Sequence, residues 1–423
     1  MPRAWFLPLV ALTLSPYAAL AQGNPTGPEF RINTFTTGFQ AFQSVAVQPG
    51  GEFVVVWHSA GQDGSGYGVF AQRYDPLGAP AGPEFRVNTF TPGAQSYANV
   101  AATRAGTGAF VVVWSSTGQD GSAAGVFAQR YDVGGTPLGP EFRVNTYTAY
   151  NQDYPAAAAD GAGNFVVVWR SASQDGSGYG VFGQRYSSSG APLGPEFRVN
   201  TYTTGNQYFH TRVAVDQDGD FVVVWTSDAG QDGSGPSVMG QRYASTGVPQ
   251  GPEFLVNTYT TGNQRYPSVI TDDPGNFVVL WNSFGQNGDL PGVFGQRYAS
   301  SGAPLGGEFR VNTHTTGLQV VFSAAADAGG NFVVVWHDGS GADGSSYGVF
   351  GQRFDSSAAP LGPEFLANTF TPAAQSVPSV GANALGQFVV AWSSYGQDGS
   401  DYGVFGQRYT PILPVELMWF GVE

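Results

Sequence analysis

Apolar and polar positions along this chain follow a pattern that repeats. The most apolar segment of each repeat is a five-residue run such as FVVVW, which predicts a strand covered on both faces. The segments VFGQRY and PEFRVN alternate apolar with polar residues, as strands with one wetter face do. The segment before FVVVW is rich in small residues, at 45–47, 156–159 and 324–326, and is expected at a crowded inner edge. Each repeat therefore predicts four strands.

The repeat occurs seven times at intervals of 55 to 57 residues, a signature of radial β-propellers. The core tryptophans of the seven copies are Trp57, Trp114, Trp169, Trp225, Trp281, Trp336 and Trp392. The chain opens on PEFRIN at 28–33, and its final repeat stops after VFGQRY at Tyr409. The fold class we predict is all-β: a seven-bladed β-propeller of four-stranded antiparallel blades, closed by the N-terminal PEFRIN strand joining the last blade.

The first 21 residues have the pattern of a cleaved secretory signal peptide. They contain Arg3, an apolar run through Leu14, and the small residues ALA at 19–21 before Gln22. No later run reaches the roughly 18 apolar residues of a membrane span, so we expect no membrane insertion. The expected domains are a signal peptide at 1–21, the propeller at 22–410 and, at 411–423, a C-terminal linker or the remnant of a sorting-domain junction. The expected location is secreted, extracellular or at the cell surface.

Composition narrows the range of partners. The chain has no cysteine, which excludes disulfides and thiolate metal sites. Its formal net charge is −14, and all 17 basic residues are arginines, most of them in the repeated EFR and QR positions. Few cations remain for a basic stripe, so we expect no nucleic-acid partner. The expected partner is an extracellular polysaccharide or a surface protein, and the expected state is a monomer.

The longer, more polar loops are expected at one end of the propeller. The loop S-x-GQDGSG, between the second and third strands, and the loop TYTTGNQ, into the next blade, emerge at the same end, where propellers often bind ligands. The opposite end receives tight turns, among them the aspartate-rich turn at 216–220, which reads as a hairpin turn rather than a metal loop.

The QDG element of the long loops supplies candidate metal ligands. Its carboxylates are Asp63, Asp120, Asp175, Asp232, Asp343 and Asp398, with Asn287 in the fifth copy. Calcium is the cofactor that such oxygen-rich loops indicate. The alternative, which we favour, is that each aspartate caps its own turn. The repeated Gln40 and its counterparts could add an oxygen or tie two blades together, and Glu84 with Arg73 could form a pair across the outer strands.

An enzyme would show itself by asymmetry between the repeats. The residue after each core tryptophan varies, and His58, Arg170 and His337 are the chemically versatile cases. Together with Arg212 and Asp338 they could line a central funnel. The alternative, which we favour, is a solvated rim whose residues vary without a functional role. No two of them form a recognisable catalytic pair, and Ser-His-Asp, zinc and phosphate-loop motifs are absent from the sequence.

Tyrosines near the long loops are candidate sugar-stacking residues. The four at the start of the third strand are Tyr67, Tyr179, Tyr347 and Tyr402. Packing between blades is the alternative role of these rings.

The repeat GPEFRVNTYTTGNQ…FVVVWTS…GQDGSGYGVFGQRYD resembles repeats of large bacterial secreted and surface proteins, over residues 27 to 409. Such repeats often stand beside adhesin-type and calcium-binding modules. The tail LPVEL at 413–417 resembles the junction before C-terminal sorting domains of type IX secretion, although no sorting domain follows before Glu423.

Together these features predict a secreted or cell-surface binding and adhesion module that recognises carbohydrate or another extracellular polymer through its long-loop face. The alternatives are a glycan-active enzyme of propeller fold, either a glycosidase or a lyase, and a purely structural scaffold.

Overall fold

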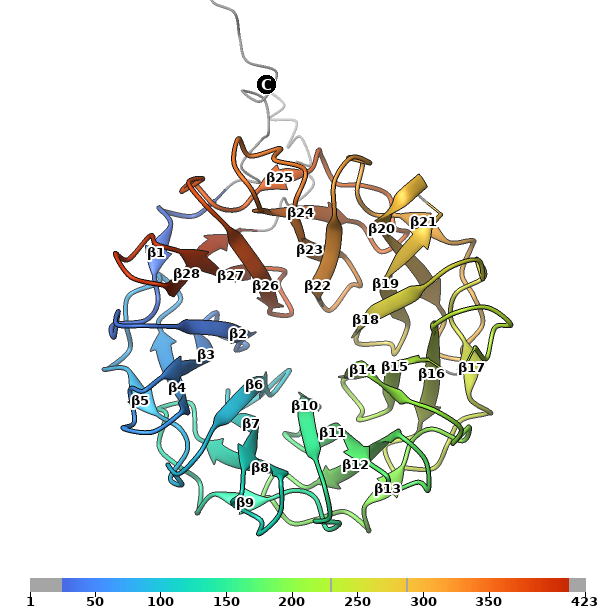
Figure 1. Cartoon of the computed structure of the whole chain (residues 1–423), viewed down its shortest axis with the longest axis horizontal. Helices are drawn as coiled ribbons and strands as arrows, with labels where there is room; N and C mark the ends of the chain where they lie inside the picture. The colour runs from blue at the N-terminus through green and yellow to red at the C-terminus, as the bar shows by residue number, and fades with distance from the viewer. Residues whose placement is uncertain (1–24, 229, 287, 411–423) are drawn as a thin grey trace, which may run out of the picture.

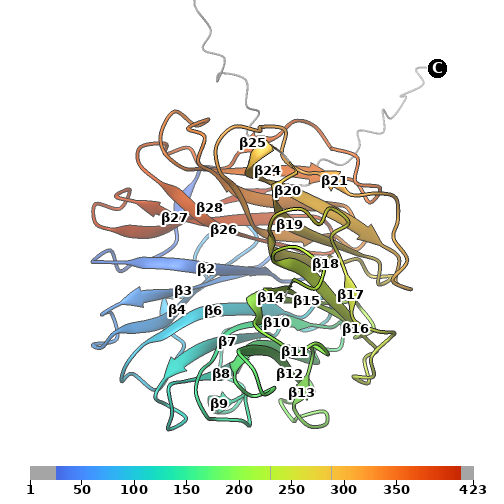
Figure 2. The same cartoon turned by 45° about the vertical axis from the view of Figure 1, so that its right-hand side comes forward.

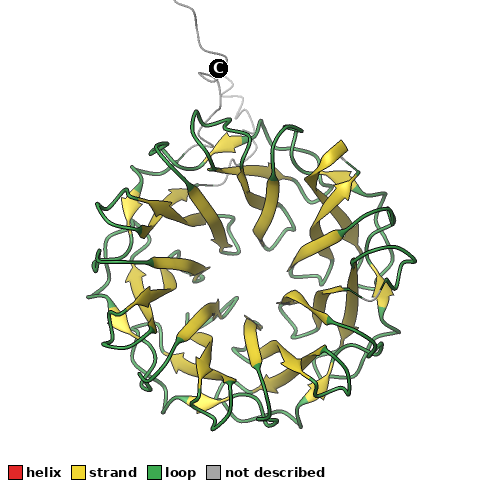
Figure 3. Ribbon diagram, viewed as in Figure 1, coloured by secondary structure: helices red, strands yellow, loops and turns green. Residues whose placement is uncertain are grey.

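The computed structural model describes residues 25–228, 230–286 and 288–410. These residues form seven four-stranded antiparallel sheets arranged as the blades of a ring (Figure 1). The described part of the chain is made of strands and loops without a helix, as Figure 3 shows. The predicted seven-bladed β-propeller is confirmed. The predicted signal peptide and the LPVEL junction lie outside the described residues.

The strands fall into four concentric sets. The innermost strands are β2 (Gln40–Val47), β6 (Gln95–Ala102), β10 (Gln152–Ala159), β14 (Gln207–Val215), β18 (Gln264–Thr271), β22 (Gln319–Ala326) and β26 (Gln375–Ala382). The second strands are β3 (Phe53–Ala60), β7 (Phe110–Thr117), β11 (Phe165–Ala172), β15 (Phe221–Ser227), β19 (Phe277–Gly285), β23 (Phe332–Asp338) and β27 (Phe388–Tyr395).

Two further sets complete the blades. The third strands are β4 (Tyr67–Tyr74), β8 (Ala124–Tyr131), β12 (Tyr179–Tyr186), β16 (Ser237–Tyr243), β20 (Gly288–Tyr298), β24 (Gly348–Phe354) and β28 (Tyr402–Tyr409). The outermost strands are β1 (Phe30–Arg31), β5 (Phe85–Arg86), β9 (Phe142–Arg143), β13 (Phe197–Arg198), β17 (Phe254–Leu255), β21 (Phe309–Arg310) and β25 (Phe365–Leu366). We number the blades 1 to 7 from β2–β5 to β26–β28, the last of which includes β1.

The N-terminal strand closes the ring as the sequence predicts. Strand β1 pairs with β28, with Phe30 opposite Gly406 and Arg31 opposite Phe405. The Ile32 amide donates to the Val404 carbonyl at 2.8 Å. The next ladder position is taken by a side chain, because the Val404 amide donates to Oδ1 of Asn33 at 2.7 Å. The outer strand is therefore only two residues long, shorter than the PEFRIN pattern suggests.

The hydrophobic core lies between the blades, which follow one another around the ring (Figure 2) and pack face to face. Residues Val54, Val55, Val56 and Trp57 of β3 are all fully buried. Val54 and Val56 pack toward blade 2, whereas Val55 and Trp57 pack toward blade 7. The FVVVW run thus has two apolar faces because each second strand is covered by a neighbouring blade on both sides.

The repeated glutamate of PEF links adjacent blades. Glu84 Oε2 of blade 1 accepts from the Thr34 amide at 2.6 Å, just beyond the outer strand of blade 7, and Glu84 Oε1 accepts from Gln62 of its own blade. The expected Glu84–Arg73 pair is wrong. Arg73 donates instead to the Gly134 carbonyl of blade 2, because the register of β4 and β5, with Ala71 opposite Phe85, brings Gln72 and not Arg73 toward Glu84.

Candidate functional site

A cavity of about 630 Å³ lies on the propeller axis, lined by the innermost strands. Large side chains of successive blades surround it: Phe42, Tyr97, Tyr154, His210, Tyr266 and Phe322. We call these six residues the aromatic ring. Below them the wall narrows to smaller side chains such as Val45, Val100 and Ala157. The cavity therefore has an aromatic mouth and an aliphatic base.

A β-bulge in each innermost strand turns these side chains toward the axis. In β6 the pairing with β7 shifts between Ser96 and Asn99, and equivalent shifts occur in the other six innermost strands. The bulged residue has a positive φ in six blades: Phe42, Tyr97, Tyr154, His210, Tyr266 and Val377. Non-glycine residues rarely adopt this conformation, and such strain is concentrated at functional sites. Five of the six aromatic-ring residues are strained in this way, and all of them line the cavity.

The residue after the core tryptophan holds the bulge of the next blade. His58 Nδ1 accepts from the Tyr97 amide at 3.4 Å, and Ser115 Oγ accepts from the Tyr154 amide at 3.1 Å. Asn282 Oδ1 accepts from the amide of Val321 at 3.0 Å. Different polar side chains thus satisfy the amide that the bulge leaves without a ladder partner.

Ring contacts make the wall continuous across several blades. The Tyr97 and Tyr154 rings are stacked, with centroids 3.9 Å apart and planes at 25°. His210 meets the Tyr266 ring edge-on at 4.7 Å. The Phe42 and Tyr97 centroids are 5.8 Å apart. Such packed rings present a large apolar surface with few soft torsions.

Arg212 is the cation of this otherwise neutral wall. It projects from β14 at a position where the other innermost strands carry Ser44, Asn99, Ala156, Ser268, Ser323 and Ser379. Its Nη1 donates to the Thr211 carbonyl at 3.1 Å. Burial lowers the Arg212 pKa to about 10, so the guanidinium stays charged at neutral pH. Burial and the Arg212 charge lower the His210 pKa to about 3, so that imidazole is neutral.

Another arginine crosses the axis at the tight-turn end. Arg104 belongs to blade 2, and its Nη1 donates to the Val215 carbonyl of blade 4 at 3.3 Å. Its Nη2 reaches blade 5, where it donates to the carbonyl of Thr271 at 3.2 Å and to Asp273 Oδ1 at 3.0 Å. The channel is therefore obstructed at the tight-turn end, and the cavity is approached from the long-loop end.

The expected funnel residues occupy four different places. His337 and Arg212 line the cavity. His58 is 3% exposed and lies behind Phe42, with centroids 5.0 Å apart. Arg170 lies beside the ring, where its Nε binds Asp153 Oδ1 at 2.5 Å and its guanidinium covers the Tyr154 ring at 4.1 Å. Asp338 is buried and accepts from the Ser340 amide at 2.7 Å.

The tyrosines singled out from the sequence lie outside the cavity lining. Tyr67 packs on His58 at 4.8 Å, and Tyr347 packs on His337 at 5.1 Å. Tyr179 lies under the Arg170 guanidinium at 4.7 Å, and Tyr402 packs on Phe39 of blade 1 at 5.6 Å. These rings support the aromatic ring from behind. The ring residues themselves could have been found in the sequence as large side chains two or three positions after the repeated glutamine.

The QDG aspartates are engaged in their own loops. Asp63 Oδ1 accepts from the Ser65 amide at 3.2 Å, and its Oδ2 accepts from Asn88 Nδ2 at 3.3 Å. The same turn-capping bond recurs at Asp120, Asp175, Asp232, Asp343 and Asp398. The described residues contain no group of three or more His, Asp or Glu side chains arranged to hold a metal ion. Calcium binding stays a prediction.

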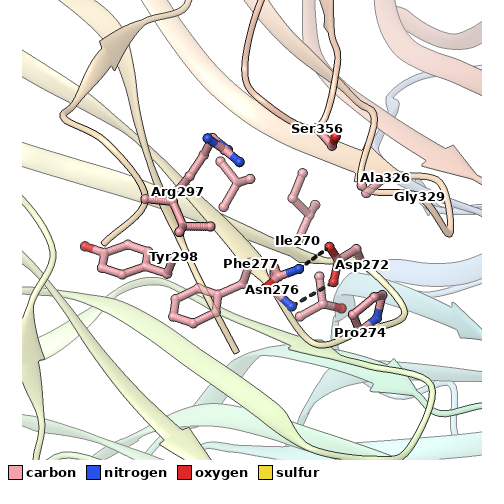
Figure 4. A pocket seen from close by; sticks show the side chains of 14 residues that line it. Ile270, Asp272, Pro274, Asn276, Phe277, Arg297, Tyr298, Ala326, Gly329 and Ser356 are labelled. Carbon is pink, nitrogen blue, oxygen red and sulfur yellow. Dashed lines mark hydrogen bonds between the residues drawn. The ribbon is translucent and has the colours of Figure 1, made fainter. Parts of the chain in front are cut away.

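A smaller cavity of about 250 Å³ lies between blades 5 and 6 at the tight-turn end (Figure 4). Its aspartate is already occupied, since Asp272 Oδ1 and Oδ2 accept from the Asn276 amide at 2.7 Å and from Asn276 Nδ2 at 2.8 Å. A similar crevice of about 230 Å³ lies between blades 3 and 4. Because equivalent crevices occur between two different pairs of blades, we interpret them as gaps left by blade packing. The axial cavity is therefore the better candidate site.

Comparisons with known proteins bear on the fold. No family model and no curated protein matches the chain. A solved protein of unknown function from Dyadobacter fermentans is 11% identical with a TM-score of 0.54, covering 92% of this chain and 99% of that one. The α-L-arabinofuranosidase Arb93A from Fusarium graminearum, in complex with an iminosugar inhibitor, is 9% identical with a TM-score of 0.51, covering 91% and 98%. At these identities the similarity shows the fold alone. The described residues include no helix with the length and apolarity of a membrane span.

Proposed function

We propose that this protein binds a carbohydrate in the axial cavity, as a secreted or cell-surface module. The observation that carries the proposal is the aromatic ring, built on backbone bulges that strain the chain. Rigid aromatic side chains offer flat apolar faces on which sugar rings can stack, while a few polar groups fix orientation. The cavity provides both, with His337 and Arg212 set among the rings.

The strain supports a ligand role rather than a packing role. A positive φ at a residue such as Tyr97 costs on the order of 1 kcal/mol or more. A packing role would not require it, because an unbulged strand would keep all its ladder bonds. The cost is repeated in six blades, and in each case the bulged side chain reaches the cavity.

The fold similarity to a glycosidase in complex with an iminosugar agrees with this proposal. The N-terminal signal pattern supports the proposed location outside the cell. Because the cavity opens at the long-loop end, we propose that adhesion occurs through the long-loop face.

The test is binding of the purified protein to a glycan array, followed by calorimetry with the best oligosaccharide. Phe42→Ala and Tyr266→Ala should each weaken binding about 10-fold, because each removes an aromatic side chain from the cavity lining. Tyr202→Ala is the matched control, since Tyr202 is 40% exposed and lies outside the cavity lining. Repeating the array with calcium and then with a chelator tests the QDG loops. Silence of the whole array, or equal binding by all variants, would refute the proposal.

A glycan-active enzyme is the second candidate, favoured by the propeller fold shared with Arb93A. Hydrolysis by the usual mechanism needs two carboxyl groups flanking the scissile bond. None of the described residues that line the cavity is Asp or Glu, and the nearby Asp153 is bound to Arg170. A lyase has no such requirement. Incubating the protein with the glycans it binds, and analysing products by mass spectrometry, separates a binding module from either enzyme.

A further inference from the structure

We infer that the ligand of the axial cavity carries a carboxylate, and that Arg212 binds it. The inference rests on the proposed function and names its substrate class: an acidic carbohydrate containing uronic acid. It starts from an asymmetry. Six innermost strands place serine, asparagine or alanine at one position of the wall, and β14 places an arginine there.

Three other arginines have carboxylate partners, whereas the buried Arg353 of β24 stacks on the Phe388 ring. Arg170 binds Asp153 at 2.5 Å, and Arg104 binds Asp273 at 3.0 Å. Arg265 lies 3.7 Å from an oxygen of Asp228. The salt bridges found within the described residues do not include Arg212, whose Nη1 donates to the carbonyl of the adjacent Thr211. The cavity therefore holds a fixed positive charge that no lining residue balances.

An unbalanced charge in a partly buried site is costly. A guanidinium away from bulk water loses hydration, and a carboxylate in bidentate contact restores both charge balance and hydrogen bonds. The protein is acidic overall, with a net charge of −14, yet its axial cavity has local positive charge. The geometry thus favours a ligand that brings its own anion.

The surrounding wall identifies the kind of anion. The aromatic side chains of Phe42, Tyr97 and Tyr266 line the same cavity as Arg212. His337 also lines it, and both of its ring nitrogens lack hydrogen-bond partners among the described residues. A small inorganic anion has no apolar face with which to contact these aromatic side chains. A pyranose ring with a carboxylate substituent uses the stacking faces and the cation together.

The test compares uronic-acid oligosaccharides with their carboxyl-reduced, neutral forms. The probes are oligomers of galacturonate, glucuronate and mannuronate, and binding to the purified protein is measured by calorimetry. The wild type should bind at least one acidic oligomer about 10- to 100-fold more tightly than its reduced form, the range expected for one charge-assisted contact.

Arg212→Gln should abolish that preference and leave the affinity for the reduced form unchanged, whereas Arg212→Lys should keep part of it. Arg86→Gln is the matched control, because it removes the same charge from an exposed position on β5. Thermal unfolding checks that each variant is folded. If Arg212→Gln does not fold, the inference is tested by Arg212→Lys and by the wild-type affinities for the acidic and the carboxyl-reduced oligomers.

The possible outcomes separate this inference from the proposed function. If reduced and acidic oligomers bind equally well, or if Arg212→Gln keeps the preference, the carboxylate inference is overturned. Should neutral oligosaccharides then still bind in a manner that depends on Phe42 and Tyr266, the proposed function stands without the carboxylate inference. If no oligosaccharide of either form binds, both the carboxylate inference and the proposed function are refuted.

Discussion

His58 is held inside the protein as a neutral imidazole. It is 3% exposed and lies among the rings of Phe39, Phe42 and Tyr67. Its Nδ1 can accept from the Tyr97 amide only while that nitrogen carries no proton. Burial lowers the His58 pKa to about 4. The same cause lowers the His337 pKa to about 4.

Stability should therefore fall on acidification. The unfolded protein protonates these histidines near pH 6.5, and the folded protein only near pH 4, so stability is complete above pH 6.5 and is lost as the pH falls toward 4. One histidine contributes at most about 2 kcal/mol between pH 6.5 and 5. Urea unfolding at several pH values measures this loss.

His58→Ser isolates the contribution of one histidine. Serine occupies the equivalent position in blade 2, where Ser115 accepts the Tyr154 amide, so the bond to the bulge can be kept. The variant should lose less stability than the wild type between pH 6.5 and 5. An identical pH profile for both proteins would show that His58 does not titrate as described.

The candidate site could be predicted from sequence only in part. Arg212 and His337 were expected near the axis and line the cavity. The aromatic ring was missed because a bulge breaks the two-residue alternation by which strand faces are assigned, so Tyr97 or Tyr154 reads as an ordinary strand residue. Tyr67 was visible because it belongs to a regular strand, and it supports the ring from behind.

Two sets of hydrogen bonds link adjacent blades, one at each end of the propeller, and we call each set a belt. At the long-loop end, a glutamate before each outer strand accepts from the threonine amide of the preceding blade, as Glu253 Oε2 does from Thr201 at 2.7 Å. At the tight-turn end, five QR arginines donate to a carbonyl of the next blade, as Arg408 does to Pro76 at 2.8 Å. Arg353 is an exception, since it is buried and stacks over Phe388 at 5.1 Å.

Removal of one glutamate from its belt should weaken one junction. Glu253→Ala removes the acceptor for Thr201 of blade 3 and for Gln231 of blade 4, and should cost on the order of 1 kcal/mol because the contacts are partly exposed. Glu52→Ala is the control, a glutamate in a tight turn outside the belt. Urea unfolding measures both. A Glu253 variant as stable as the control would contradict a linking role.

Strand order and core were predictable because FVVVW and its spacing repeat with little variation. Fully buried Val54 and Trp57 are direct consequences of that pattern. The partners of the charged residues were not predictable in the same way. Glu84 reaches back one blade and Arg73 reaches forward one blade, so pairing inferred within a single repeat gave the wrong contact.

The whole ring depends on a strand contributed from the opposite end of the chain. Besides β1, Pro25 bridges to Tyr409, and the Thr26 amide donates to the Arg408 carbonyl at 2.8 Å. Ile32 is 2% exposed, so this segment adds apolar burial as well as hydrogen bonds. The two ends of the described chain thus lie side by side in blade 7.

A chain that begins at Gly38 should be much less stable than one that begins at Pro25. The shorter chain loses strand β1, the burial of Ile32 and the cap from Asn33, about 5 kcal/mol together, which lowers Tm by on the order of 10 °C. Calorimetry and size-exclusion chromatography measure the effect. A synthetic peptide of residues 25–34 should restore the lost stability, since it can pair with β28. Equal Tm values for the two chains would contradict closure by this strand.

Arg104 determines which part of a polymer this propeller could take in. Because that side chain crosses the axis, the cavity is a blind well rather than a pore, and a long molecule cannot thread through it. A polysaccharide would have to enter by a chain terminus, one terminus per protein. Affinity would then follow the number of free ends in a sample and not its total mass, and trimming a polymer into short pieces would create sites for this protein instead of destroying them.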